Sequence, residues 1–123
     1  MTFYKLNNEI SFTTEANQIP EGAELLTPNT TDGAYEKHVP VAYQEDDKVH
    51  VKVGSVEHPM LDAHWIEWIV IETASGSYQK ADLKPGEKPE VVFSCSEPII
   101  AAYELCNLHG LWKGEPVAKI NSF

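Results

Sequence analysis

The stretch that decides the fold is HWIEWIVIET, residues 64–73, which consists mostly of β-branched and aromatic side chains. Such residues favour extended strands, and a strand with one face in water would alternate apolar and polar positions. Between Trp65 and Ile71 the apolar run is interrupted only at Glu67. The stretch therefore predicts a strand buried on both faces except at Glu67, and the small polar residues 74–77 mark its end.

Further short strands are predicted on both sides of this segment. Val49, Val51 and Val53 alternate with polar residues, which is the period of a half-buried strand. Residues 38–43 alternate in the same way, and the polar residues 44–47 supply a hairpin turn. Three more strands are predicted at residues 77–83, 90–97 and 99–106. No segment longer than two turns shows helical spacing, so we expect an all-β fold, an antiparallel β-sandwich.

The first part of the chain has a different composition. Residues 1–34 contain one lysine against five acidic residues, have only short apolar pieces, and end in the loop-like sequence TPNTTDG at 27–33. We therefore expect two parts, a small N-terminal appendage at 1–34 and a sandwich domain at 35–123.

Charge and composition exclude several classes of function. The 123 residues include 19 acidic residues and 9 basic ones, all lysines, for a formal net charge of -10. Nucleic acids and anionic membrane surfaces require clustered basic residues, so neither is an expected partner. No apolar run approaches the roughly 20 residues of a membrane span. The N-terminus has no secretory signal pattern and the two cysteines form no disulfide framework, so we expect a cytoplasmic protein.

Histidine and cysteine residues gather at the predicted strand ends. His58 and His64 flank a loop before the long strand, and Cys106 and His109 form a Cys-x2-His pair closed by a glycine. His38 lies near another strand start. A sandwich brings such loops together, where a thiolate and imidazoles can bind one metal ion. The spacing therefore predicts a metal site formed by His38, His58, His64, Cys106 and His109.

Two other candidates have plainer interpretations. His50 lies mid-strand, opposite the valine face, and is expected to be structural. Cys95 is expected to be an inert buried thiol without an assigned role.

The identity of the metal stays open between iron, copper and zinc. Five ligands overfill the closed tetrahedron of structural zinc and fit a square pyramid with one open position, which favours small-molecule chemistry. A blue-copper electron-transfer protein is the second hypothesis, but its site needs two histidines and an axial methionine, and neither Met1 nor Met60 follows His109. A binding module that uses a metal only for stability is the third.

Three motifs resemble one known family. EKHVPVAY at 36–43, KVGSVEHPMLDAHWIEWI at 52–69 and CNLHGLW at 106–112 are similar to the catalytic domain of superoxide reductases, the desulfoferrodoxin and neelaredoxin family. The resemblance runs from about Asn29 to Trp112. It implies an immunoglobulin-like sandwich and a mononuclear iron, one per chain, that reduces superoxide to hydrogen peroxide. The implied iron ligands are four equatorial histidines and one axial cysteine, namely His38, His58, His64, His109 and Cys106.

The same resemblance implies roles for residues around the ligands. Glu36 would ligate the oxidised iron at the open position, and Lys37 would attract the incoming superoxide anion. The backbone N–H groups of Leu108 and His109 would donate hydrogen bonds to the Cys106 sulfur and tune it. Lys48 and Lys52 would add positive charge near the opening if their strand faces it.

The N-terminal appendage resembles the small desulforedoxin-like domain of two-iron family members, which binds a separate iron through four cysteines. Here Leu6 and Glu9 stand at the first cysteine pair, 18–19 at the adjacent pair, and no cysteine precedes Cys95. The resemblance thus implies that the appendage carries no electrons and is kept for packing. It also implies an external electron donor such as rubredoxin and suggests a homodimer.

Overall fold

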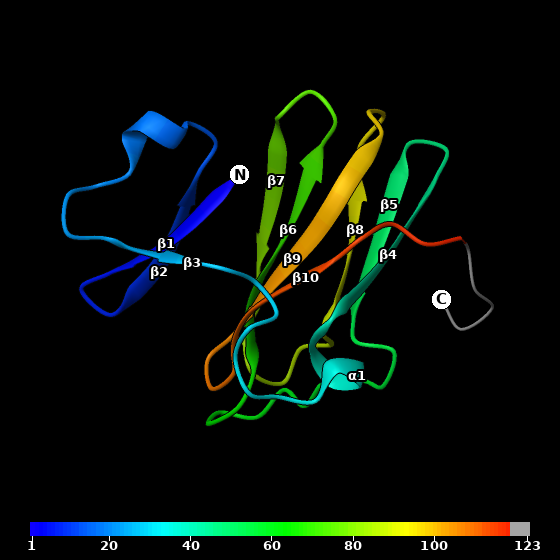
Figure 1. Ribbon diagram of the computed structural model, residues 1–123. Helices are drawn as coiled ribbons and strands as arrows, with labels where there is room; N and C mark the ends of the chain where they lie inside the picture. The colour runs from blue at the N-terminus through cyan, green and yellow to red at the C-terminus, as the bar shows by residue number, and fades with distance from the viewer. Residues whose placement is uncertain (119–123) are drawn as a thin grey trace.

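The computed structural model describes residues 1–118, about half of them in strands (Figure 1). One sheet has four antiparallel strands in the order β10-β9-β6-β7, which are β6 (Ile66–Thr73), β7 (Tyr78–Asp82), β9 (Ile99–Cys106) and β10 (Gly110–Gly114). The second has three in the order β4-β5-β8, which are β4 (Pro40–Glu45), β5 (Lys48–Val53) and β8 (Glu90–Ser94). The predicted antiparallel β-sandwich is confirmed. Residues 119–123, which the sequence assigns to the sandwich, lie outside the described residues.

The main core lies between these two sheets. Val49, Val51 and Val53 of β5 are fully buried there, as their alternation predicted, and they belong to one cluster with Ile69 and Ile71 of β6. Burial of this apolar surface is the main favourable contribution to folding.

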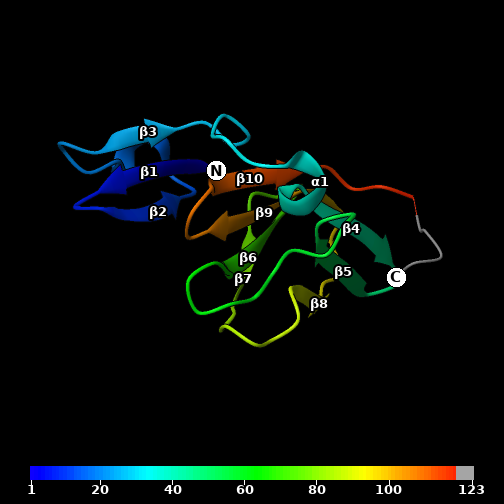
Figure 2. The same ribbon diagram turned by 90° about the horizontal axis from the view of Figure 1, so that it is seen from below.

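Residues 2–26 form a third sheet that covers the outer face of the four-stranded sheet (Figures 1 and 2). Its strands are β1 (Thr2–Leu6), β2 (Glu9–Thr13) and β3 (Glu24–Leu26), in the order β2-β1-β3, with a short 3-10 turn, η1 (Ala16–Gln18), before β3. Phe3 of β1 is buried, with its ring centroid 6.2 Å from that of Trp68 and 4.6 Å from that of Tyr103. The molecule therefore has three layers.

The three layers explain the burial of β6. Ile69 and Ile71 face the core of the sandwich, whereas Trp68 and Val70 belong to the second cluster, beneath the N-terminal sheet. Glu67 is the one position of β6 that is not fully buried, as the sequence predicted.

The structure differs from the predicted elements in several places, among them β8, which ends at Ser94 and not at residue 97. β6 begins at Ile66, because His64 instead forms a bridge with Leu61. β4 begins at Pro40, because residues before it form the one-turn helix α1 (Tyr35–His38), and the residue before a proline disfavours helix. β10 was not predicted at all, since a five-residue strand with glycine at both ends lacks the usual strand composition. Within the described residues, no helix is long and apolar enough to cross a membrane.

Candidate metal centre

Four imidazole rings form a square at the end of the sandwich where α1 lies. Around the square, the centroid distances are 4.8 Å for His38–His58, 4.7 Å for His58–His64, 5.1 Å for His64–His109 and 4.8 Å for His109–His38. The diagonal pair, His38 and His64, is 6.3 Å apart. Neighbouring rings stand at 69° to 81° to each other, while the diagonal rings are inclined by only 30°. Four rings placed in this way can bind one ion from four sides.

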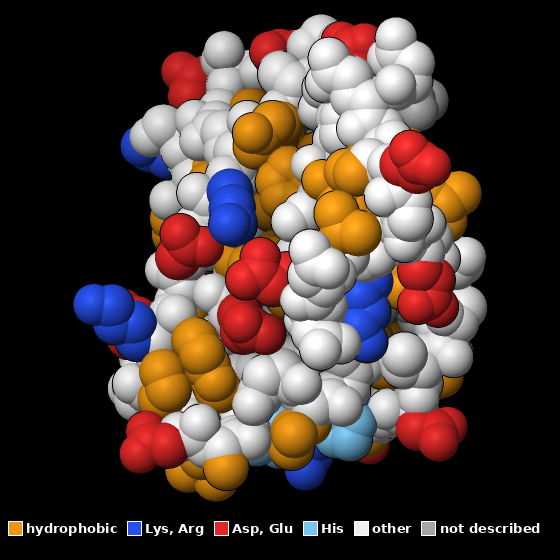
Figure 3. All heavy atoms as spheres, turned by 90° about the vertical axis from the view of Figure 1, so that its left-hand side faces the viewer, with side chains coloured by type: hydrophobic (Ala, Val, Ile, Leu, Met, Phe, Trp, Pro, Cys, Tyr) orange, Lys and Arg blue, Asp and Glu red, His pale blue; other side chains and the backbone are white. Residues whose placement is uncertain are grey.

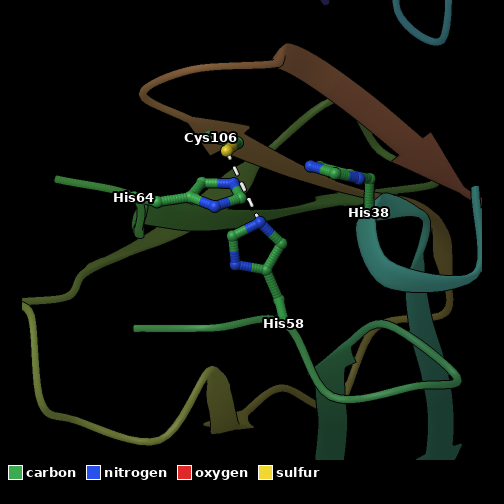
Figure 4. A group of neighbouring side chains, drawn as sticks. All are labelled: His38, His58, His64 and Cys106. Atoms are coloured by element: carbon green, nitrogen blue, oxygen red, sulfur yellow. Dashed lines mark hydrogen bonds between the residues drawn. The ribbon is translucent and has the colours of Figure 1, made fainter. Parts of the chain in front are cut away.

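Cys106 joins the square from the end of β9 (Figure 4). Its Sγ lies 3.5 Å from Nε2 of His58, and one ligand atom from each of His38, His58, His64 and Cys106 lies within 4.8 Å of all the others. Metal bonds to nitrogen and sulfur are about 2.0–2.3 Å long, so ligands on opposite sides of one ion are spaced within this limit. His109 lies outside this tightest group but completes the square of rings.

The hydrogen bonds of the histidines leave ring nitrogens free for a metal. Nδ1 of His38 faces the carbonyl oxygen of Ala34 at 2.7 Å, and Nδ1 of His58 faces that of Pro59 at 2.6 Å. Such a contact fixes Nδ1 as the protonated nitrogen and leaves the lone pair on Nε2. Nε2 of His38 and Nε2 of His64 are buried without a hydrogen-bond partner. Because an unpaired buried polar atom is costly, these two atoms fit a bound metal ion.

Burial also keeps the imidazoles neutral. It lowers the pKa of His58 to about 4 and lowers the pKa of His38 and of His64. Metal binding requires neutral imidazole, so these three side chains are ready to bind at pH 7.

The sulfur of Cys106 responds to opposing effects. Burial raises the pKa of its thiol, while hydrogen bonds from the backbone N–H groups of His109 and Leu108 lower it. These are the two N–H groups that the sequence analysis placed at the sulfur. A bound metal would favour the thiolate further.

The position of His38 is set by a contact between α1 and the residues after β5. The Glu36 carbonyl oxygen accepts hydrogen bonds from the Val56 N–H at 2.8 Å and from the Ser55 hydroxyl at 3.3 Å. A Cβ atom added at Gly54 would lie 2.6 Å from the same oxygen, so the close approach requires glycine. The sequence motif around Gly54 therefore holds α1 against β5.

His109 is enclosed by a segment that the sequence analysis placed in the appendage. Nδ1 of His109 faces the Asp32 carbonyl oxygen at 2.8 Å, and the Thr31 hydroxyl donates to the His109 carbonyl oxygen. A Cβ atom at Gly33 would lie 3.3 Å from both His109 and His38. Sequence reasoning missed these three neighbours of the site, although the close packing of Gly33 is a reason for a glycine in this loop.

Glu36 and Lys37 are both exposed on α1, beside the square. After burial and His109, the charge of Lys37 is the next cause that lowers the pKa of His64, so this ammonium group acts electrostatically on the site. Histidine side chains reach the surface at the lower end of the face in Figure 3, where acidic groups are also plentiful.

Lys48 adds no positive charge at the opening. Lys48 lies at the far end of β5 from Val53, roughly 17 Å away along the strand, and its ammonium group donates to Ser94. Lys52 is the cross-strand neighbour of Glu90, whose charge offsets its own.

Four further residues lie outside the cluster. His50 stacks on Tyr43 with ring centroids 4.5 Å apart, and the Cys95 thiol is buried and donates to the Glu97 carbonyl oxygen at 3.4 Å. Glu104, which the sequence analysis did not single out, is fully buried, and neither carboxyl oxygen has a partner. Burial raises the pKa of Glu104 well above its ordinary value. The sulfur of Met60, which the sequence analysis dismissed as an axial copper ligand, accepts a hydrogen bond from the Ile66 N–H.

Comparisons with known proteins agree with this site. The Desulfoferrodoxin family model matches residues 30–115. The desulfoferrodoxin of Nitratidesulfovibrio vulgaris is 48% identical over 95 residues, which cover 77% of this chain and 75% of that protein. The superoxide reductase of Thermococcus kodakarensis is 33% identical over 98 residues, covering 65% of this chain and 85% of that protein.

A solved structure extends the similarity to the N-terminal sheet. The crystal structure of the superoxide reductase from Treponema pallidum matches with a TM-score of 0.77 and 34% identity, covering 94% of this chain and 99% of that one. A match of this extent leaves out only a few residues, so it includes most of the three-stranded N-terminal sheet as well as the sandwich.

Proposed function

The chain belongs to the desulfoferrodoxin family, and from this premise we propose that it is a superoxide reductase with a mononuclear iron centre. In the proposed reaction one superoxide anion takes up one electron and two protons and becomes hydrogen peroxide. The observation that carries the proposal is the square of four imidazoles joined by one cysteine sulfur.

The proposed iron ligands are the five residues of the cluster. The four imidazoles and the one thiolate would hold the iron together, namely His38, His58, His64, His109 and Cys106. The two unpaired Nε2 atoms and the lowered histidine pKa values support this assignment. Bound iron would supply the electron by cycling between its ferrous and ferric states.

The residues around the ligands would prepare the site for an anion. The Cys106 sulfur, held by the N–H groups of Leu108 and His109, would donate electron density to the metal. Lys37 would attract superoxide, because its charge is exposed and acts at His64. Glu36, on the same exposed turn, is the proposed carboxylate ligand of the oxidised iron.

The electron must come from outside the chain. No cysteine precedes Cys95, so the N-terminal sheet cannot hold the four-cysteine iron of two-iron relatives. We propose one iron per chain and an external carrier protein such as rubredoxin, in the cytoplasm.

A homodimer formed through the outer face of the N-terminal sheet, where Leu25 is 64% exposed, is also proposed and can be checked by sedimentation.

A direct test is anaerobic mixing of the reduced, iron-loaded protein with superoxide. We expect one peroxide per oxidised iron and no released dioxygen, because a reductase oxidises its iron instead of a second superoxide. Release of dioxygen, or zinc as the bound metal of the isolated protein, would contradict the proposal. Protein stripped of metal is the control and should give only the background rate.

A further inference from the structure

Asn107 stands between two of the proposed ligands and contacts the segment of a third. Asn107 is the first residue of the three-residue loop between β9 and β10. Cys106 and Gly110, which flank this loop, pair with each other. Its side-chain Oδ1 accepts a hydrogen bond from the Trp65 N–H at 2.9 Å, and its Nδ2 donates to the Ala63 carbonyl oxygen at 3.0 Å. Its backbone N–H donates to the Trp65 carbonyl oxygen at 3.2 Å. One residue thus holds the backbone on both sides of His64.

The backbone of this loop cannot make the hydrogen bonds that the Asn107 side chain makes to residues 63 and 65. β6 and β9 are paired as far as Ile66 and Cys106, and the next pair of the ladder is the single bond between Asn107 and Trp65. Beyond it the chain turns, and the N–H groups of Leu108 and His109 point at the Cys106 sulfur. The side-chain amide of Asn107 therefore supplies one acceptor and one donor that a continuing strand would have supplied.

The segment around His64 has little other support. Leu61 and His64 exchange two backbone hydrogen bonds at 2.9 and 3.1 Å, but Leu61 belongs to the same exposed loop. Within residues 1–118, three hydrogen bonds of Asn107 tie residues 63–65 to the turn that carries Cys106 and His109.

We infer that Asn107 is a positioning residue that holds the His64 imidazole in the square opposite His38. The inference rests on the proposed iron site. Groups that orient a metal ligand from outside the coordination sphere commonly change metal affinity 10- to 100-fold when removed. Without the amide, residues 63–65 would separate from the turn, and His64 would be the first ligand to leave the metal.

The test compares the rate of iron release to a ferrous chelator from four iron-loaded proteins: wild type, Asn107→Ala, Asn107→Asp and Gln44→Ala. Gln44 of β4 is the matched control, because its side-chain amide contacts the chain at the opposite end of β9. Its amide donates to the Glu97 carbonyl oxygen at 2.6 Å and accepts from the Ile99 N–H at 3.1 Å, far from any proposed ligand. We expect release about tenfold faster from Asn107→Ala and an unchanged rate from Gln44→Ala.

Asn107→Asp separates positioning from charge. Aspartate keeps the acceptor for the Trp65 N–H, loses the donor to Ala63 and adds a negative charge, which by itself would hold a cation more tightly. We expect its release rate to lie between those of wild type and Asn107→Ala. This variant also carries the test if Asn107→Ala does not fold. Amide hydrogen exchange of Trp65 should accelerate in Asn107→Ala and stay slow in Gln44→Ala.

Two results would overturn the inference. One is release from both Asn107 variants at the wild-type rate, and the other is release from Gln44→Ala as fast as from Asn107→Ala. Failure of the proposed function would look different, since the wild-type protein would hold iron but form no peroxide from superoxide. The release rates would still decide whether Asn107 positions His64.

Discussion

The N-terminal sheet and the metal-site end of the sandwich belong to one molecule but serve it in different ways. The N-terminal sheet has no histidine or cysteine, and its inner face is a set of apolar rings packed on Trp68 and Tyr103. The metal-site end concentrates four histidines and one cysteine, of which His38, His58 and Cys106 are themselves buried. The candidate ligands therefore lie in one region, and the N-terminal sheet contributes apolar burial without ligands.

This difference gives a structural reason for the chain to keep the N-terminal sheet although that sheet has no cysteine ligands for iron. Trp68 and Val70 of β6 and Tyr103 of β9 point away from the sandwich core and would be exposed without a cover. Burying apolar surface yields roughly 25 cal/mol per Å², so the cover contributes to stability whether or not it binds a metal. A substitution in the N-terminal sheet should then lower stability and leave the iron chemistry intact. A substitution of a ligand at the metal-site end should impair the iron chemistry and affect stability less.

The largest expected effect is on the chemistry. Cys106→Ala should lower the rate of superoxide reduction by more than about 100-fold, because it removes a proposed metal ligand. Removing a residue that only orients a ligand usually has an effect of about 10- to 100-fold. Peroxide formation after rapid mixing measures it. Cys95→Ala, which removes a similarly buried thiol away from the cluster, is the control and should keep full activity. Equal losses in the two variants would show that the site has no special dependence on Cys106.

Phe3→Ala should have the largest effect on stability. Removing a buried phenylalanine costs about 3–5 kcal/mol, and this ring contacts both Trp68 and Tyr103. Denaturant unfolding measures the loss, while the visible spectrum of the ferric protein should not change. Tyr4→Ala, on the outer face of the same strand, should cost much less. A changed spectrum in Phe3→Ala would break the division between the two regions.

Acid should protonate the buried histidines of the metal-site end. In the metal-free protein the pKa of His58 is lowered to about 4, so between about pH 6.5 and 4 the unfolded chain binds a proton that the folded chain does not. The contribution of His58 to stability is therefore intact above pH 6.5 and falls by about 3 kcal/mol as pH drops to 4, with His38 and His64 adding in the same direction. Glu67 and Glu104, whose pKa values are raised by burial, act in the opposite direction in all variants. Unfolding curves at pH 7 and 4.5 measure this loss. His58→Gln should reduce it and Phe3→Ala should not, and an equal pH dependence in all three proteins would refute the assignment.

The sandwich could be predicted because the residues of its strands show the alternation or the β-branched composition that is typical of strands. β9 matches the predicted residues 99–106 from end to end, and β6 differs only by the two residues that turn toward the site. The strands of the N-terminal sheet gave no such signal, because they are short and their burial depends on an outer face of the sandwich that composition does not reveal.

The residues of the proposed site show the same contrast. Histidine and cysteine are rare enough that their spacing indicated the cluster, and the structure brings all five side chains together. Asn107 and Asp32 could not be found in this way, since their role depends on hydrogen bonds to residues 42 and 77 positions away in the sequence. Asparagine and aspartate are also common in turns for local reasons, so neither drew notice.

The smallest expected effect concerns the approach of the substrate. Lys37→Ala should slow the second-order reaction with superoxide about 3- to 10-fold and weaken its dependence on salt, because one steering charge is lost while the proposed ligands stay. Stopped-flow mixing at several salt concentrations measures it. Lys48→Ala removes the same charge at the far end of β5 and should change neither quantity, although the net charge of the two variants is identical. If both variants slowed the reaction equally, net charge would control the encounter, and the site would gain nothing from the place of Lys37. A difference between them would show that a chain with a net charge of -10 attracts an anion through local charge at one end.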